Sequence, residues 1–404
     1  MIRQATCDAL GYSVVEIGRS RHVFTVAAPR RGGAIEAQLQ DVLGQLDQLF
    51  ADQDARESIV TLALFVRDEA DRDTCRQHVR RHFAGRMPAT SYVLQPPCDG
   101  RLVAAEAMAL GGSADAAIDR VSEHMVVARH DGIAWVHVAD IRPDVADPRV
   151  YPRAWSGFRG LQRQLSERGY RYEQVIRTWL YLGDIVGPEG DTQRYKELNR
   201  ARSDFYDTIR FESERFACPC RPKAYPASTG IGTEGRDIVM SCIALETDRD
   251  DVVTKPLENP KQTAACDYGQ QYGIRSPMFS RAMAVVAGRS VTTLVSGTAS
   301  ITGEDTQHLD DVAAQTDQTL TNIEALISDE NLAAHGLPGC GARLDDMALM
   351  RVYVKYAADF ARTREVCRAR LGDVPTVYTI GDVCRPELLV EIEGIVCTER
   401  RGLV

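Results

Sequence analysis

The sequence contains no apolar run that approaches the roughly 20 residues needed to span a lipid bilayer. The segment from Met1 to Glu16 lacks a basic stretch followed by an apolar one, so we expect no signal peptide and a cytoplasmic protein. Basic residues are in deficit, since 48 Lys and Arg stand against 57 Asp and Glu, a formal charge of -9. Proteins that bind nucleic acid usually present a basic surface. The composition therefore argues against nucleic acid and membrane as partners and leaves room for a local basic pocket that binds a small anion.

Spacings typical of metal ligands are also missing. The eight histidines form no HExxH-like motif, and Cys218 and Cys220 are the only close cysteine pair, without a second pair or a nearby histidine. We therefore predict no metal. The 11 cysteines are scattered along a chain without an export signal, so we expect reduced thiols rather than disulfides.

What the sequence does contain is an internal repeat. Its 404 residues exceed one domain of about 100–200 residues. In each third, an amphipathic helix is followed by an apolar strand, a second helix, a proline-led turn and a closing strand. In the first third we expect these five elements, in that order, at 34–50, 58–66, 70–83, 87–90 and 101–106. In the second third we expect them at 155–168, 174–182, 194–206, 225–230 and 237–246. In the last third we expect them at 310–327, 347–354, 358–371, 374–376 and 388–396.

This order predicts an α+β protein of three tandem modules, each a mixed sheet with two helices packed on one face. Turn-forming and charged residues near 111–113 and 248–260 mark the joints. The predicted modules are 1–113, 114–250 and 251–404, with the active site in the last one. The alternative is three unrelated α/β domains that are similar by chance.

Five segments follow one another between residues 170 and 400. They read RTWLYL from Arg177, YPASTGIG from Tyr225, ENPKQTAACDYGQQYGIRSPMFSRA from Glu258, SGTASITGE from Ser296 and DVCRPELLVEIEG from Asp382. As an ordered set they resemble the chorismatases, a family within the Rid (YjgF) superfamily whose members remove the enolpyruvyl group from chorismate. Ordinary Rid proteins are homotrimers of one chorismate-mutase-like module with sites at subunit interfaces. The resemblance therefore implies three Rid-like modules arranged as a pseudo-trimer, either as a monomer or as a homo-oligomer.

Chorismate is a small dianion with an enol ether, so its cleavage needs Arg and Tyr donors and a carboxylic acid that stays protonated near neutral pH. In the strand 389–393, alternation places Glu391 and Glu393 on one face, where like charges raise each other's pKa if the face is enclosed. The alternative is a solvated strand face.

Counting from each turn proline aligns the closing strands in two columns: Glu391 with Ala104 and Cys242, and Glu393 with Glu106 and Ala244. A carboxylate in the first column occurs once, so a triplicated scaffold would have one acid site. The resemblance likewise implies that Glu391, the first Glu of VEIEG, is the catalytic acid.

Gly297 and Cys384 bear on the product. Chorismatases that make 3-hydroxybenzoate resemble this chain in having Gly and Cys at these positions, whereas those that release a dihydroxycyclohexadiene carboxylate tend to carry Ala at both. The resemblance implies 3-hydroxybenzoate and pyruvate as products, with a ring hydroxyl attacking the protonated enol ether and Cys384 guiding collapse to the aromatic ring. Read alone, Gly297 could be a crowded backbone position and Cys384 an inert buried thiol.

Tyr268, Tyr272, Arg275 and Arg281 are the candidates for gripping the substrate carboxylates, because a small anionic ring is bound by flat surfaces and donors together. They could instead pack as a linker between modules. Arg177, on an apolar strand, either binds the anion or forms a structural ion pair. Protonation and elimination need no cofactor, so none is predicted.

Two departures keep other functions open. Leu180 replaces the Asn of the family's RTWNY, and the helix around Asn199 looks more like ordinary Rid proteins. Imine-hydrolysing Rid proteins use an Arg just after the turn proline, and this chain has Ala89, Ala227 and Thr376 there, which argues against that reaction. A non-catalytic metabolite-binding protein on the same fold remains a further alternative.

Overall fold

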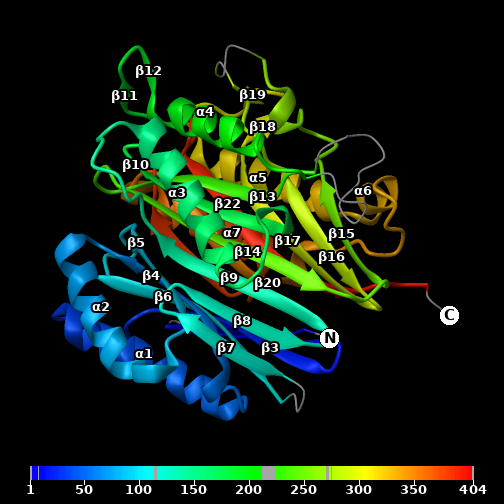
Figure 1. Ribbon diagram of the computed structural model, residues 1–404. Coiled ribbons are helices and arrows are strands. Elements are labelled where there is room, and N and C mark those ends of the chain that lie inside the picture. Colours follow the sequence, from blue (N-terminus) through cyan, green and yellow to red (C-terminus); the bar gives the residue numbers. More distant parts are fainter. Residues whose placement is uncertain are drawn as a thin grey trace.

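Three six-stranded sheets form the protein (Figure 1). The computed structural model describes residues 2–7, 9–112, 116–211, 224–269, 273 and 275–402. The first sheet has the order β1-β2-β3-β6-β4-β5. Its elements are β1 (Ile2–Thr6), β2 (Leu10–Ile17), β3 (Ser20–Ala27), α1 (Ile35–Asp52), β4 (Ile59–Val66), α2 (Glu69–Phe83), β5 (Ala89–Leu94) and β6 (Val103–Gly111).

The second sheet repeats this topology, in the order β7-β8-β9-β14-β10-β13. Its elements are β7 (Ala117–Ser122), β8 (Met125–His130), β9 (Ile133–Ile141), α3 (Val150–Ser166), β10 (Val175–Gly183), α4 (Arg194–Tyr206), β13 (Ala227–Thr233) and β14 (Ile238–Thr247), with the small pair β11 (Pro188–Glu189) and β12 (Thr192–Gln193) before α4.

The third sheet repeats it again, in the order β15-β16-β17-β22-β20-β21. Its elements are β15 (Val252–Leu257), β16 (Ala282–Ala287), β17 (Ser290–Ala299), α5 (Val312–Ile327), β20 (Met347–Val354), α7 (Phe360–Leu371), β21 (Thr376–Ile380) and β22 (Val390–Glu399), with β18 (Ile301–Thr302), β19 (Asp305–Thr306) and α6 (Asp329–Ala334) added.

The three repeats confirm the predicted α+β class and the two helices and closing strand of each module. Two features were not predicted. Three antiparallel strands open each sheet before the first helix, and each proline-led turn leads directly into a strand that pairs in parallel with the apolar strand before it. Each sheet falls within one predicted module, but the exact module boundaries stay a prediction.

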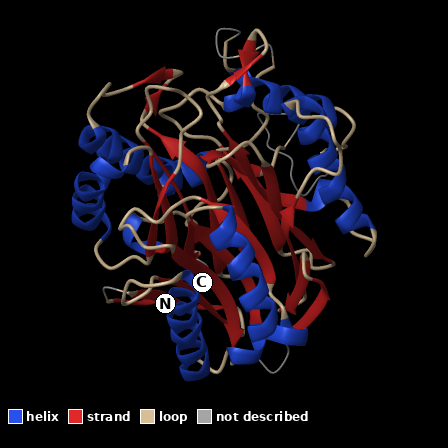
Figure 2. Ribbon diagram, turned by 90° about the vertical axis from the view of Figure 1, so that its left-hand side faces the viewer, coloured by secondary structure: helices blue, strands red, loops and turns tan. Residues whose placement is uncertain are grey.

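Apart from the largely exposed edge strands β1 and β7, each sheet is buried on both faces. One face is covered by its own two long helices, which form three separate apolar cores. The opposite faces pack against one another in a shared core, to which the three sheets contribute the equivalent side chains Phe65, Tyr181 and Tyr353. Figure 2 accordingly shows strands in the middle of the molecule and helices outside. Burial on both faces explains why the central strands are apolar almost throughout. The pseudo-threefold arrangement stays a prediction.

Among the described residues, none of the helices has the length and apolar character that a membrane span would need.

Candidate active site

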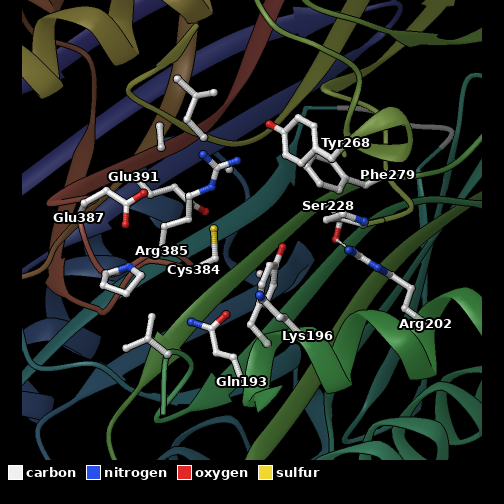
Figure 3. A pocket seen from close by; sticks show the side chains of 18 of the residues that line it. Gln193, Lys196, Arg202, Ser228, Tyr268, Phe279, Cys384, Arg385, Glu387 and Glu391 are labelled. Carbon is white, nitrogen blue, oxygen red and sulfur yellow. Dashed lines mark hydrogen bonds between the residues drawn. The ribbon is translucent and has the colours of Figure 1, made fainter. Parts of the chain in front are cut away.

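A cavity of about 530 Å³ lies where the second and third modules meet. Backbone donors join the two sheets at its floor: the Ser228 N–H donates to Ser296 Oγ over 2.9 Å, and the Gly297 N–H donates to Thr229 Oγ1 over 2.9 Å. Helix α4 and β13 supply the wall from the second module. The third module contributes β17, β22, the loop between β21 and β22, and Tyr268, Pro277, Phe279 and Arg281. Figure 3 shows Cys384, Arg385, Glu387 and Glu391 on one side of the cavity and Tyr268, Phe279, Ser228 and Arg202 on the other.

Glu391 is only 5% exposed and faces this cavity. Burial raises the pKa of Glu391 to about 8, and the charge of Glu393 adds to the rise, while Arg177 and Arg281 oppose it. Its carboxyl group is therefore largely protonated at neutral pH and can donate a proton into the cavity.

Glu393 lies on the same face of β22 but stays ionised. Burial alone would raise the pKa of Glu393, yet Arg177 and Arg351 outweigh it and the pKa is lowered. Arg177 Nη2 donates to Oε2 over 2.6 Å, Trp179 Nε1 donates to Oε1 over 2.8 Å, and Arg351 Nη1 lies 3.2 Å from Oε1. Two carboxyl groups separated by one residue are thus held in different protonation states, an arrangement that separates a proton donor from a fixed charge.

Gly297 makes room for the acid. A Cβ at this position would overlap Oε1 of Glu391 and come within 3.1 Å of Thr229 Cγ2. Any side chain on residue 297 would therefore displace the Glu391 carboxyl group.

Cys384 also lines the cavity, and its thiol stays protonated. Burial raises the pKa of Cys384 to about 12, and the charge of Glu391 contributes to the rise. Tyr195, from the start of α4, lies nearby, and its pKa is raised by burial, then by Cys384. Neither group ionises at neutral pH, so both act as neutral polar walls.

Two buried arginines face the cavity without a carboxylate partner among the described residues. Arg281 Nη2 donates to the carbonyl of Thr263 over 2.8 Å and to Tyr268 Oη over 2.6 Å. Arg202, 1% exposed, donates from Nη2 to Asn199 Oδ1 over 2.5 Å.

The Nε atoms of both arginines have no hydrogen-bond partner in the described part of the chain. Phe279 lies between them, with its ring centroid 5.5 Å from Cζ of Arg202 and 5.3 Å from Cζ of Arg281. A buried guanidinium without a counter-charge is costly. The pair can therefore accept an anion beside a flat apolar surface.

The structure brings together Glu391, Cys384, Tyr268, Arg281 and Gly297 around one cavity. It does not bring the other predicted residues there. Arg177 is absent from the described lining and forms the structural ion pair with Glu393, the alternative raised for it from the sequence. Arg275 is also absent from the described lining and lies half-exposed, 3.4 Å from Asp204, so its substrate contact stays a prediction. Tyr272 lies outside the described residues.

The contribution of the second module was missed. Arg202, Tyr195, Lys196 and Ser228 all line the cavity. A signal for Arg202 existed, because helical spacing from the apolar Leu198 and Phe205 places it beside the buried face of α4, where an arginine needs a partner or an anion.

The repeat alignment needs one correction, in the second module. Equivalent backbone bonds join the paired strands in each sheet, from Arg67 N–H to Leu102 O, Gly183 N–H to Asp237 O and Lys355 N–H to Leu389 O. They align Glu391 with Ala104 and Val239 rather than Cys242, and Glu393 with Glu106 and Ser241 rather than Ala244. The connection between β13 and β14 is shorter than its counterparts, so counting across it misplaced the strand. A carboxylate at the Glu391 position still occurs once.

Within the described residues, no group of three or more His, Cys, Asp or Glu side chains could hold a metal ion. Cys218 and Cys220 lie outside those residues.

Comparisons with known proteins show which family this chain resembles. A family model described as "Chorismatase FkbO/Hyg5-like, N-terminal" matches residues 113–244. A protein named 3-hydroxybenzoate synthase from Streptomyces hygroscopicus is 36% identical over 56% of this chain, and the match spans 64% of that protein, just under two thirds of its length. A protein named chorismatase from Streptomyces rapamycinicus is 34% identical over 66% of this chain and 78% of that protein.

A crystal structure of a chorismatase aligns with a TM-score of 0.64 and 25% identity, covering 84% of this chain and 93% of that one. The predicted family and the predicted α+β class of three repeated modules are thereby confirmed, while the relation to the Rid proteins stays a prediction. The chain belongs to the chorismatase family.

Proposed function

We propose that this protein converts chorismate to 3-hydroxybenzoate and pyruvate, with Glu391 as the general acid. One observation carries the proposal: a carboxyl group whose pKa is raised to about 8 faces a cavity that also holds two buried arginines without carboxylate partners among the described residues. A proton donor beside an anion site is what protonation of a bound enol ether dianion requires.

The two carboxylates of chorismate would supply the negative counter-charges that Arg202 and Arg281 lack among the described residues. Arginine binds carboxylates through charge-assisted hydrogen bonds, and the unpartnered Nε atom of each offers such a donor. The substrate ring would rest against Phe279 and Tyr268, and the cavity of about 530 Å³ is of the size typical for small-molecule sites.

Glu391 would give its proton to the methylene carbon of the enol ether, which leaves positive charge on the ether carbon. A ring hydroxyl attacks that carbon, loses its proton and forms a cyclic ketal. Loss of the hydrogen on the ether-bearing ring carbon breaks the bond between the ring and the attacking oxygen, which makes the ring aromatic. The remaining hemiketal splits into pyruvate and the phenol, which takes up the proton that the hydroxyl released. The proton gained by the methylene carbon is balanced by the ring proton lost on aromatisation. The acid is therefore restored without a cofactor, and no water is consumed.

The alternative, chorismate hydrolysis to a dihydroxycyclohexadiene carboxylate, does consume one water molecule. Gly297 and the Cys384 thiol favour the first route, because the family members that hydrolyse tend to carry Ala at both positions. Cys384 faces the same cavity as Glu391, where a neutral thiol can direct the collapse of the adduct. A non-catalytic chorismate-binding protein remains the second alternative.

Incubation of the purified protein with chorismate tests the proposal, with both pyruvate and the ring product measured. We expect equal amounts of pyruvate and 3-hydroxybenzoate. Pyruvate with the dihydroxycyclohexadiene carboxylate would support the hydrolase, and no pyruvate despite bound chorismate would support the binding protein.

A further inference from the structure

A second cavity of about 300 Å³ lies where the third and first modules meet. It is enclosed by α7, β21, the end of β3, the segment from Thr6 to Gly11 and Ala104 of β6. None of these elements belongs to the cavity that contains Glu391.

The two cavities are built from equivalent parts. Helix α7 takes the place of α4, β21 that of β13, and β3 that of β17 in the repeated topology. The register makes the match residue by residue: Glu391 pairs with Tyr353 in the third sheet, and Ala104 pairs with the equivalent Phe65 in the first. The second cavity therefore occupies the same relative position, one module junction further on.

The second cavity differs from the first in two ways, which remove the acid and the anion-binding segment but leave a cavity. Ala104 carries no acid at the position of Glu391. The long connection between β15 and β16, which supplies Tyr268 and Arg281 to the first cavity, corresponds to the short connection between β1 and β2. A ligand in the second cavity would meet no proton donor equivalent to Glu391.

Cationic and aromatic side chains nevertheless line this cavity. Arg364 is half-buried and Arg368 is exposed, and neither has an ion-pair partner among the described residues. Tyr378 packs edge-on against Phe360, with ring centroids 5.4 Å apart, and both line the cavity. Asp99 also lines it, and its Oδ1 accepts the backbone N–H of Arg101 over 3.1 Å. Two arginines beside aromatic rings suit a small ring carboxylate.

The three modules place an arginine at the same helical position, directly after a buried small residue. Arg76 follows Cys75, Arg202 follows Ala201, and Arg368 follows Cys367. Arg76 is bound to Asp140 over 2.9 Å. Its two counterparts lack a carboxylate partner in the described part of the chain, and both line a cavity. Arg368 thus shares with Arg202 the lack of a carboxylate partner and the place beside a cavity, but Arg368 is exposed whereas Arg202 is buried.

We propose that the cavity between the third and first modules binds a small aromatic carboxylate without transforming it. The inference rests on the lining of this cavity and does not depend on the reaction proposed for Glu391. If that reaction is correct, its ring product belongs to this chemical class, so the site would sense product.

Binding of 3-hydroxybenzoate, measured by calorimetry on the full chain, tests the proposal. The substitution Arg281→Gln should weaken binding of 3-hydroxybenzoate in the first cavity, so that the binding that remains reports on the second cavity. This variant should still bind one equivalent of 3-hydroxybenzoate. Adding Arg364→Gln and Arg368→Gln should weaken that binding at least about tenfold, because both charge-assisted contacts are lost.

Ala28→Phe, at the edge of the second cavity, fills its volume without removing charge and should have the same effect. Arg362→Gln is the matched control on the same helix, since the Arg362 side chain is 68% exposed and lies 4.0 Å from Glu365; it should leave binding unchanged. The proposal is overturned if the Arg281→Gln protein binds no 3-hydroxybenzoate, or if its binding survives Ala28→Phe or the loss of both arginines. Chorismate turnover by the unaltered protein tests the Glu391 reaction separately.

Discussion

Arg177 Nη2 lies 2.6 Å from Oε2 of Glu393, and this ion pair fixes a negative charge two residues beyond Glu391 on β22. The pair does not line the described cavity, yet it affects the pKa of the proton donor there, Glu391. A carboxylate that remains ionised beside Glu391 disfavours a second charge, and so helps to keep the Glu391 proton in place.

Replacing Glu391 with Gln should lower kcat for chorismate by a factor of about 10²–10⁴, the range typical of a lost general acid. Substrate affinity should survive, because Gln keeps the shape of the side chain and the anion site is untouched. Steady-state kinetics and chorismate binding would be measured together. Glu399→Gln, at the exposed end of the same strand, is the control and should retain full activity. Unchanged turnover in the Glu391 variant would refute the acid role.

The rate should fall with rising pH. Because Glu391 must be protonated to act and its pKa is about 8, kcat/KM should be level below that value and decline above it, by about tenfold per pH unit. A pH profile of pyruvate release from about pH 6 to 10 would show this single descending limb. A rate that increases through this range would instead require an ionised base.

Gly297→Ala should reduce 3-hydroxybenzoate formation at least about tenfold, because the added Cβ overlaps the Glu391 carboxyl group and moves it. Combining it with Cys384→Ala should raise the share of dihydroxycyclohexadiene carboxylate among the products. Both products would be quantified by chromatography. Gly44→Ala is the control: this glycine lies in α1 with nothing within 4 Å of an added Cβ, so activity should not change. Full activity of Gly297→Ala would contradict the crowding argument.

Arg202→Gln should raise KM for chorismate at least about tenfold and change kcat less, since the guanidinium is assigned to substrate binding. Arg200, two residues away, is already bound to Glu197 by a bond of 2.5 Å and is 42% exposed, so Arg200→Gln is a matched control. A loss of kcat with unchanged KM would reassign Arg202 to the chemical step.

Arg177→Met should destabilise the fold by about 3–5 kcal/mol, because it removes one partner of a buried ion pair and leaves Glu393 under-compensated. Urea denaturation would give the free energy of unfolding. Arg289→Met removes a largely exposed partner of Glu399, 3.6 Å away, and should cost no more than about 1 kcal/mol. A small effect of Arg177→Met would mean that Arg351 alone satisfies the buried carboxylate.

Much of the fold could be predicted because each module repeats strong local signals. The helical spacing in α1, α5 and α7 and the apolar runs of β4, β10 and β20 predicted those elements to within a few residues. The opening strands β1–β3 and their repeats were missed. Most of them have no single polar face, because one face meets helices and the other meets the remaining sheets, whereas the edge strands β1 and β7 are largely exposed.

The site could be predicted only where its functional side chains lie close together in one segment of the sequence. Glu391 and Glu393 share a strand face, and that could be read from alternation alone. Their different protonation states could not, because Arg177 comes from a different module and Arg351 from a different strand. The place of Arg202 at the cavity was missed for the same reason, because Arg202 meets Ser228 and Phe279, which come from later parts of the chain.

The connection between β15 and β16 is long, whereas its counterpart between β1 and β2 spans a few residues. In an assembly of identical subunits, any such insertion would be copied into every junction at once. Joining three modules in one polypeptide removes that constraint, so an enlarged segment can specialise one junction while the others acquire independent properties. Evolution could therefore adjust catalysis and regulation by separate mutations in the same molecule.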